Sequence, residues 1–124
     1  MIADDEDNNL HLQDAELISG TVSVNPVFNL QKIYLDAFPQ QSGSAGSRYP
    51  TVNEAINNRI ENGTLIFNFI GHGGSARLAE EVILDQSMIN GWNNSNRLPL
   101  FVTATCDFAP YDNPFLNSIG KIFC

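Results

Sequence analysis

Residues 65–74 read LIFNFIGHGG, and residues 98–106 read LPLFVTATC. Each stretch is a short apolar run, rich in aromatic and β-branched residues, that ends in one chemically reactive side chain. Runs of this kind are typical of strands buried on both faces of a parallel sheet. The carboxyl ends of parallel strands share one edge of the sheet, where ligands bind in open α/β folds. The sequence therefore predicts that His72 and Cys106 lie at the same edge, on neighbouring strands.

An imidazole beside a thiol suggests nucleophilic catalysis. The thiolate is the reactive form of cysteine, and a nearby imidazole can take the thiol proton. Acyl transfer also requires donors that stabilise an oxyanion, and the backbone N–H groups of Gly73 and Cys106 are the candidates. The glycines around His72 let a substrate backbone come close, which makes Gly74 a candidate substrate-binding residue. The alternative for Cys106 is a buried structural thiol, since free cysteine packs like a small apolar residue.

The flanking sequence supplies the other elements of an α/β fold. Residues 51–62 show a helical apolar face, capping-box spacing from Thr51 to Glu54 and a stop at residues 62–63. Such a helix is the crossover that parallel strands at residues 31–35 and 65–70 require. Another helix is expected from residue 10, capped by residues 7–9 and ended by Gly20.

The remaining segments are less regular. Residues 39–50 read as a flexible surface loop, residues 76–84 as a mixed segment, and residues 107–114 as a loop over the site. Asp85 can cap a short helix, and a further helix is expected from Phe115 onward.

Composition limits the function classes. The apolar content is 43%, typical of a folded domain, and 124 residues suffice for one core. The net charge of −8 argues against nucleic acid or an anionic membrane as partner. No apolar run is long enough to span a bilayer, and no signal peptide is visible, which taken alone suggests a cytoplasmic protein.

Other readings of the His–Cys pair fit less well. Zinc takes three or four ligands, usually in closely spaced pairs, and no Cys-x-x-Cys is present. His11 is expected to be exposed or to cap a helix, so no metal site is predicted. The glycine-rich turn lacks the Lys-Ser/Thr ending of a phosphate loop, and it is not a Gly-x-Ser-x-Gly elbow. A disulfide between Cys106 and Cys124 is not expected, because it would disable the thiol.

Several motifs together resemble the gingipain family of cysteine peptidases, within the caspase-like clan. The resemblance is carried by IGHGG at residues 70–74, LPLFVTATC at residues 98–106 and ADDEDNN at residues 3–9, with support from residues 32–39 and 48–50. It implies a three-layer α/β/α caspase-like sheet, mostly parallel. Residues 1–124 are expected to be a partial catalytic domain, incomplete at both ends, with signals and flanking domains outside it.

The resemblance also assigns roles to the acidic stretch at residues 4–7. In gingipains an acidic side chain from the comparable region orients the catalytic histidine, so Glu6 and Asp7 are the candidates for a third catalytic group. Family structures also carry calcium, which oxygen ligands suit, although the spacing here matches no EF-hand. A solvated loop that caps the following helix is the alternative.

The closest likeness is to the branch of the family that acts as the cell-surface sortase of the type IX secretion system. It implies a cysteine endopeptidase or transpeptidase that cleaves carboxy-terminal signals from secretion cargo and works with other type IX secretion components. It implies a location at the cell surface or outer membrane of a Gram-negative bacterium. Two alternatives stay open: a catalytically inert truncated fragment, and an Arg/Lys-specific gingipain-like protease with Asp107 or Asp112 in an acidic substrate pocket.

Overall fold

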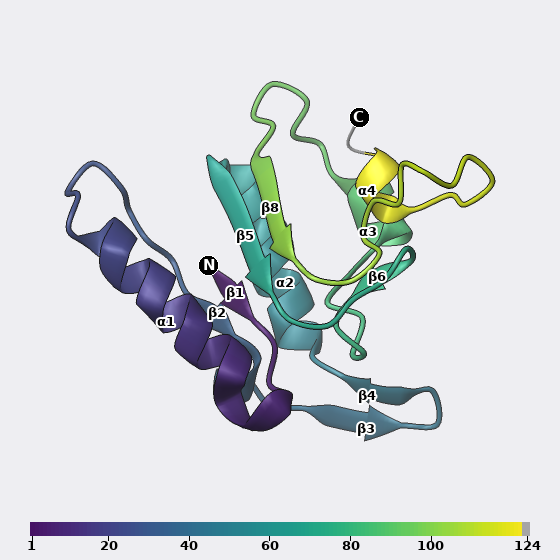
Figure 1. The fold of residues 1–124 in the computed structure, drawn as a ribbon, viewed down its shortest axis with the longest axis horizontal. Coiled ribbons are helices and arrows are strands. Elements are labelled where there is room, and N and C mark those ends of the chain that lie inside the picture. The colour runs from purple at the N-terminus through teal and green to yellow at the C-terminus, as the bar shows by residue number, and fades with distance from the viewer. Residues whose placement is uncertain (123–124) are drawn as a thin grey trace.

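The computed structural model describes residues 1–122 and shows a parallel sheet at the centre of the fold (Figure 1). The strand order is β2-β1-β5-β8, and every neighbouring pair is parallel. The predicted α/β class and the pairing of the two strands that precede His72 and Cys106 are therefore confirmed. The strands are β1 (Ile2–Ala3), β2 (Ile33–Tyr34), β5 (Ile66–Ile70) and β8 (Leu100–Ala104).

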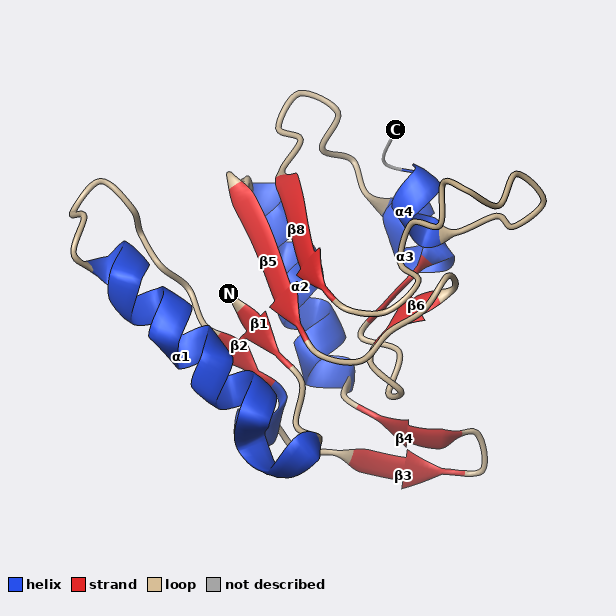
Figure 2. Ribbon diagram, in the orientation of Figure 1, coloured by secondary structure: helices blue, strands red, loops and turns tan. Residues whose placement is uncertain are grey.

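Helices cover the two faces of this sheet (Figure 2). On one face, Phe67 and Phe69 of β5 pack in the main core with the apolar side of α2 (Pro50–Asn62). On the other face, Ile70 joins a small cluster with Ala15 of α1 (Leu10–Ser23). Because successive strand residues point to opposite faces, this alternation places one helix on each side of β5. The result is the predicted three-layer arrangement.

The edge strand β8 differs from the prediction of burial on both faces. Phe101 is packed against the main core, but Leu100 on the opposite face is 61% exposed. The reason is that α1 packs mainly against β1 and β5. Burial on both faces holds for the carboxyl half of β5, where Phe69 and Ile70 are both buried.

Smaller elements occupy the less regular segments. Residues 39–50 contain a hairpin rather than a flexible loop, and the mixed segment at residues 76–84 carries short antiparallel strands. Asp85 accepts a hydrogen bond from the Met88 N–H at 2.9 Å, which confirms the predicted cap. These elements are β3 (Gln41–Gly43), β4 (Gly46–Arg48), β6 (Arg77–Leu78), β7 (Leu84–Asp85) and α3 (Gln86–Gly91).

Two predicted helix ends and one predicted helix cap are wrong. α1 continues past Gly20, because that residue has open space around it and its backbone stays helical. α2 begins at Pro50 without a side-chain cap, so the capping box does not form. The last helix, α4 (Ile119–Ile122), begins four residues later than expected. None of the helices within residues 1–122 is both long and apolar enough to cross a membrane.

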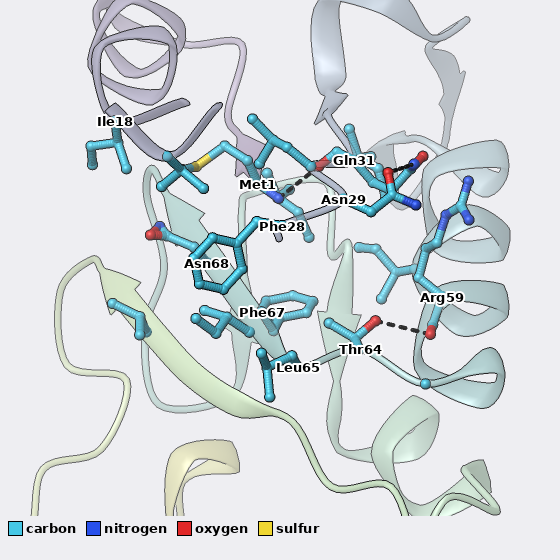
Figure 3. Close-up of a pocket in the computed structure, with 18 of the residues that line it drawn as sticks. Met1, Ile18, Phe28, Asn29, Gln31, Arg59, Thr64, Leu65, Phe67 and Asn68 are labelled. Atoms are coloured by element: carbon cyan, nitrogen blue, oxygen red, sulfur yellow. Dashed lines mark hydrogen bonds between the residues drawn. The ribbon is translucent and has the colours of Figure 1, made fainter. Parts of the chain in front are cut away.

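A hollow lies beside β5 and β8, toward the amino end of β5 (Figure 3). Its volume is about 580 Å³, and apolar side chains such as Ile18, Phe28 and Leu65 line much of it. His72 and Cys106 follow the opposite, carboxyl ends of these strands, so the hollow plays no part in the chemistry predicted for them.

Gly71, directly after β5, generates a test of this packing. A Cβ added there would lie 2.4 Å from the Asp4 Cβ, and the φ of +155° disfavours larger residues. We expect Gly71→Ala to lower the free energy of unfolding by at least about 2 kcal/mol, measured by urea denaturation. The control is Gly20→Ala in an open helical position, which should raise stability by about 0.5–1 kcal/mol. A neutral Gly71→Ala would contradict the close approach of β1 and β5.

Candidate active site

His72 and Cys106 occupy equivalent positions after paired strands. β5 and β8 run in parallel register to Ile70 and Ala104, and each reactive residue follows two positions later. The Gly71 N–H donates to the Ala104 carbonyl at 3.2 Å, which extends the pairing toward the two residues. The Cys106 side chain is a free thiol and is exposed. The two residues therefore share the carboxyl edge of the sheet, and the sulfur is open to a substrate.

Gly73 brings the two loops into contact. A Cβ on Gly73 would lie 2.6 Å from the Thr105 Oγ1, so a side chain there would collide with the residue before Cys106. Gly73 also pairs with Leu78 as an isolated antiparallel bridge, whose hydrogen bonds use the His72 carbonyl and the Gly74 N–H. In such a pair the N–H of the central residue points away from its partner. The Gly73 N–H therefore remains available as an oxyanion donor.

Asp4 anchors the His72 loop through a backbone hydrogen bond. Its side chain is 1% exposed, and its Oδ2 accepts the backbone N–H of His72 at 2.8 Å, while its Oδ1 accepts that of Asp5 at 3.1 Å. Burial raises the pKa of Asp4, and the two backbone donors oppose that rise. Asp4 is thus a buried anchor, so the alternative of a solvated loop does not hold for Asp4, whereas Asp7 is exposed.

Asp7 is the acidic group closest to the His72 ring. Its Oδ2 lies 3.0 Å from the His72 Nε2, whereas the Glu6 Oε2 lies 3.5 Å away. The turn that presents it contains three successive left-handed residues, since φ is +56°, +54° and +65° at Asp7, Asn8 and Asn9. Backbone strain of this kind persists where the surroundings enforce it, often at functional sites. Asn9 makes no side-chain cap to α1, so the predicted capping role of this segment is wrong.

The charges around His72 favour its protonated form. Burial lowers the pKa of His72, but the hydrogen bond and negative charge of Asp7 and the charge of Glu6 raise it, with a net rise. An imidazolium beside a cysteine stabilises the thiolate. The acidic turn therefore favours a positively charged ring at the edge of the sheet that also carries Cys106.

His11 is the residue of this region that sequence reasoning missed. Its ring packs edge-on against the His72 ring, with centroids 5.1 Å apart, and its Nε2 lies 3.4 Å from the Asp7 Oδ2. The side chain is only 14% exposed, so the expectation of an exposed or capping histidine is wrong. The sequence carried no local signal for this contact, because the left-handed residues 7–9 separate Asp7 from the regular turns of α1.

A cluster of three carboxylate side chains lies next to the site. Asp4, Asp5 and Glu81 each offer an oxygen within 4.8 Å of the others. Glu81 is 7% exposed, and its Oε2 has no hydrogen-bond partner among the described residues. An oxygen-only set suits a hard cation such as calcium, so these residues are the ones that would hold the calcium implied by the resemblance.

The remaining predicted residues have less defined surroundings. The Gly74 N–H donates to the Arg77 carbonyl at 3.0 Å, and no atom of residues 1–122 lies within 4 Å of an added Cβ. Asp107 follows Cys106 in a left-handed conformation with φ of +42°, and both Asp107 and Asp112 are exposed. Cys124 lies outside the described residues, so the structure does not test its pairing with Cys106.

Comparison with known proteins identifies the family. The model of peptidase family C25 matches residues 1–124. The chain therefore belongs to family C25, the gingipain family of cysteine-type peptidases. Its parallel sheet flanked by helices agrees with the caspase-like fold of that family. No curated protein and no solved structure matched the chain.

The buried Glu81 of the carboxylate cluster predicts how the stability of the fold depends on pH. Burial, with the charges of Asp5 and Asp4, raises the pKa of Glu81. A carboxyl with a raised folded pKa destabilises the fold as pH rises above its unfolded value of about 4.3. The stability gained by Glu81→Gln should therefore grow from pH 4 to pH 7, measured by urea denaturation in EDTA. The adjacent exposed residue supplies the control Glu80→Gln, which should show no such growth; equal curves for both variants would contradict the burial.

Proposed function

We propose that this chain carries the catalytic dyad of a cysteine endopeptidase or transpeptidase, with His72 as base and acid and Cys106 as nucleophile. The observation that supports this most is their matched position, two residues beyond strands paired in register. Adjacent parallel strands lie about 4.8 Å apart, a spacing that long side chains at one edge can bridge. Asp7 beside the imidazole supplies the third group of a triad.

The reaction proceeds through a thioester. The Cys106 thiolate attacks the scissile carbonyl, and the developing oxyanion accepts hydrogen bonds from the N–H groups of Gly73 and Cys106. The imidazolium of His72 gives its proton to the leaving amine, which breaks the peptide bond and leaves the acyl group on sulfur. Neutral His72 then takes a proton from water or from an acceptor amine, whose attack on the thioester releases the thiolate and regenerates the thiolate–imidazolium pair.

Asp7 acts on the imidazole in this scheme. Its carboxylate binds Nε2, which fixes the ring orientation and favours the protonated state. The other ring nitrogen, Nδ1, then exchanges the proton with sulfur and substrate. Because the Glu6 oxygen lies farther from Nε2, Glu6 contributes charge rather than a hydrogen bond.

The finer assignment is a sortase of the type IX secretion system, similar to PorU. The motifs at residues 3–9, 70–74 and 98–106 support it, together with membership of family C25. The substrates would be secretion cargo with carboxy-terminal signal domains, at the outer surface of a Gram-negative cell. Attachment of that cargo would require an amine on a surface acceptor that attacks the thioester.

Thiol labelling tests the dyad without a known substrate. In a Cys124→Ser background, Cys106 should react with iodoacetamide at pH 6 at least about tenfold faster than a free cysteine does, because His72 stabilises its thiolate. His72→Ala should remove this acceleration, while His11→Ala should retain most of it. Slow labelling that is unaffected by His72→Ala would favour the inert chain.

Substitutions in the acidic turn test the third group. Asp7→Asn should lower kcat on a cleaved peptide by at least about tenfold, because the amide cannot stabilise the imidazolium. Glu6→Gln should lower kcat by less than about threefold, since a partly exposed charge contributes little. An equal loss of kcat in both variants would contradict the assignment of Asp7 as the third catalytic group.

The fate of the thioester separates sortase from protease. Cargo peptides with a carboxy-terminal signal, incubated with an amine acceptor, should yield an amide product in mass spectrometry, and Cys106→Ser should yield none. Fluorogenic peptides with Arg or Lys before the cut provide the comparison. Efficient hydrolysis of these peptides with no amide product would support an Arg/Lys-specific gingipain-like protease instead.

A further inference from the structure

Three potential metal ligands meet beside the candidate dyad. Asp7, His11 and His72 each offer one atom, and these atoms lie within 4.8 Å of one another. His11 has no part in the proposed peptide cleavage, yet it packs against the base of the dyad. We propose that Asp7, His11 and His72 form a zinc site whose occupation reversibly blocks the peptidase; the blocking, though not the binding, rests on the proposed function.

The distances suit tetrahedral zinc. With bonds of about 2.0–2.1 Å to imidazole nitrogen and carboxylate oxygen, neighbouring ligand atoms in a tetrahedron lie about 3.3 Å apart. The Asp7 Oδ2 lies 3.0 Å from the His72 Nε2 and 3.4 Å from the His11 Nε2. Three such ligands with an open fourth position taken by water are a common zinc arrangement.

The His11 ring has a buried nitrogen that a metal ion would satisfy. Its Nε2 is buried and has no hydrogen-bond partner with acceptable geometry in residues 1–122. Buried polar nitrogens in folded proteins normally have a partner, and a metal ion in this position would supply one. Two imidazoles favour zinc over calcium or magnesium, which prefer oxygen ligands.

The site is also accessible. The side chains of His72 and Asp7 are 43% and 53% exposed, so an ion can enter from solvent while His11 closes the inner side. Zinc at the His72 Nε2 replaces the hydrogen bond that this nitrogen donates to Asp7 and holds the ring as a neutral ligand. A metal-bound imidazole cannot be the imidazolium that protonates the leaving amine, so zinc blocks turnover until it is removed.

Isothermal titration with zinc sulfate tests the binding directly. A Cys124→Ser background should bind one zinc ion, and His11→Gln should weaken this binding by about tenfold or more. The matched control is Glu16→Gln, on the same helix but paired with Lys32, which should bind zinc unchanged. Undiminished binding in His11→Gln, or binding lost equally in Glu16→Gln, would overturn the site.

The activity arm separates this proposal from the proposed function. Zinc should inhibit peptide cleavage, and adding EDTA should restore it. The His11→Gln variant, with its rate compared with its own zinc-free rate, should require about tenfold more zinc for the same inhibition. Inhibition that does not depend on His11 would overturn the blocking role. If no cleavage is found at all, the proposed function fails, while the titration alone still decides the zinc site.

Discussion

The hydrogen bond from the backbone N–H of His72 to the buried carboxylate of Asp4 is the interaction on which the site depends. A buried carboxylate is unfavourable unless donors satisfy it, and within residues 1–122 the backbone N–H groups of residues 72 and 5 donate to Asp4. The bond ties the end of β1 to the end of β5. Gly71 permits it, because a side chain at that position would occupy the space of Asp4. The acidic turn after Asp4 is thereby held against the histidine.

The negative charges of Glu6 and Asp7 lie on one side of the His72 ring. Cys106 follows the adjacent strand, β8. Glu6 and Asp7 raise the pKa of the imidazole, although its burial works in the opposite direction. The same carboxylate at residue 7 serves two imidazoles, since it approaches both His72 and His11. An arrangement that favours an imidazolium in the absence of metal also supplies the ligands for a metal cation. The competition between proton and zinc for these groups is the physical basis of the proposed control.

Local signals in the sequence predicted the elements that depend on their own composition. The apolar runs before His72 and Cys106 form the paired strands β5 and β8, and the apolar periodicity of residues 52–60 forms the buried face of α2. Signals that compete with tertiary packing failed. Gly20 does not end α1, because a single glycine is tolerated within a helix that packs on the sheet. The exposure of β8 also could not be read, since it depends on how far α1 extends across the sheet.

By itself the sequence determined the pair of reactive side chains and their placement at the ends of adjacent parallel strands, because apolar runs of strand length must be buried and parallel strands end at a shared edge. Only the tertiary structure decided which acidic group contacts the imidazole and that a second histidine lies beside it. Those contacts depend on the left-handed turn at residues 7–9, which places Asp7 against His72 although the two residues are far apart in the sequence. Backbone conformations of this kind are enforced by long-range packing, for which a single sequence carries no local signal.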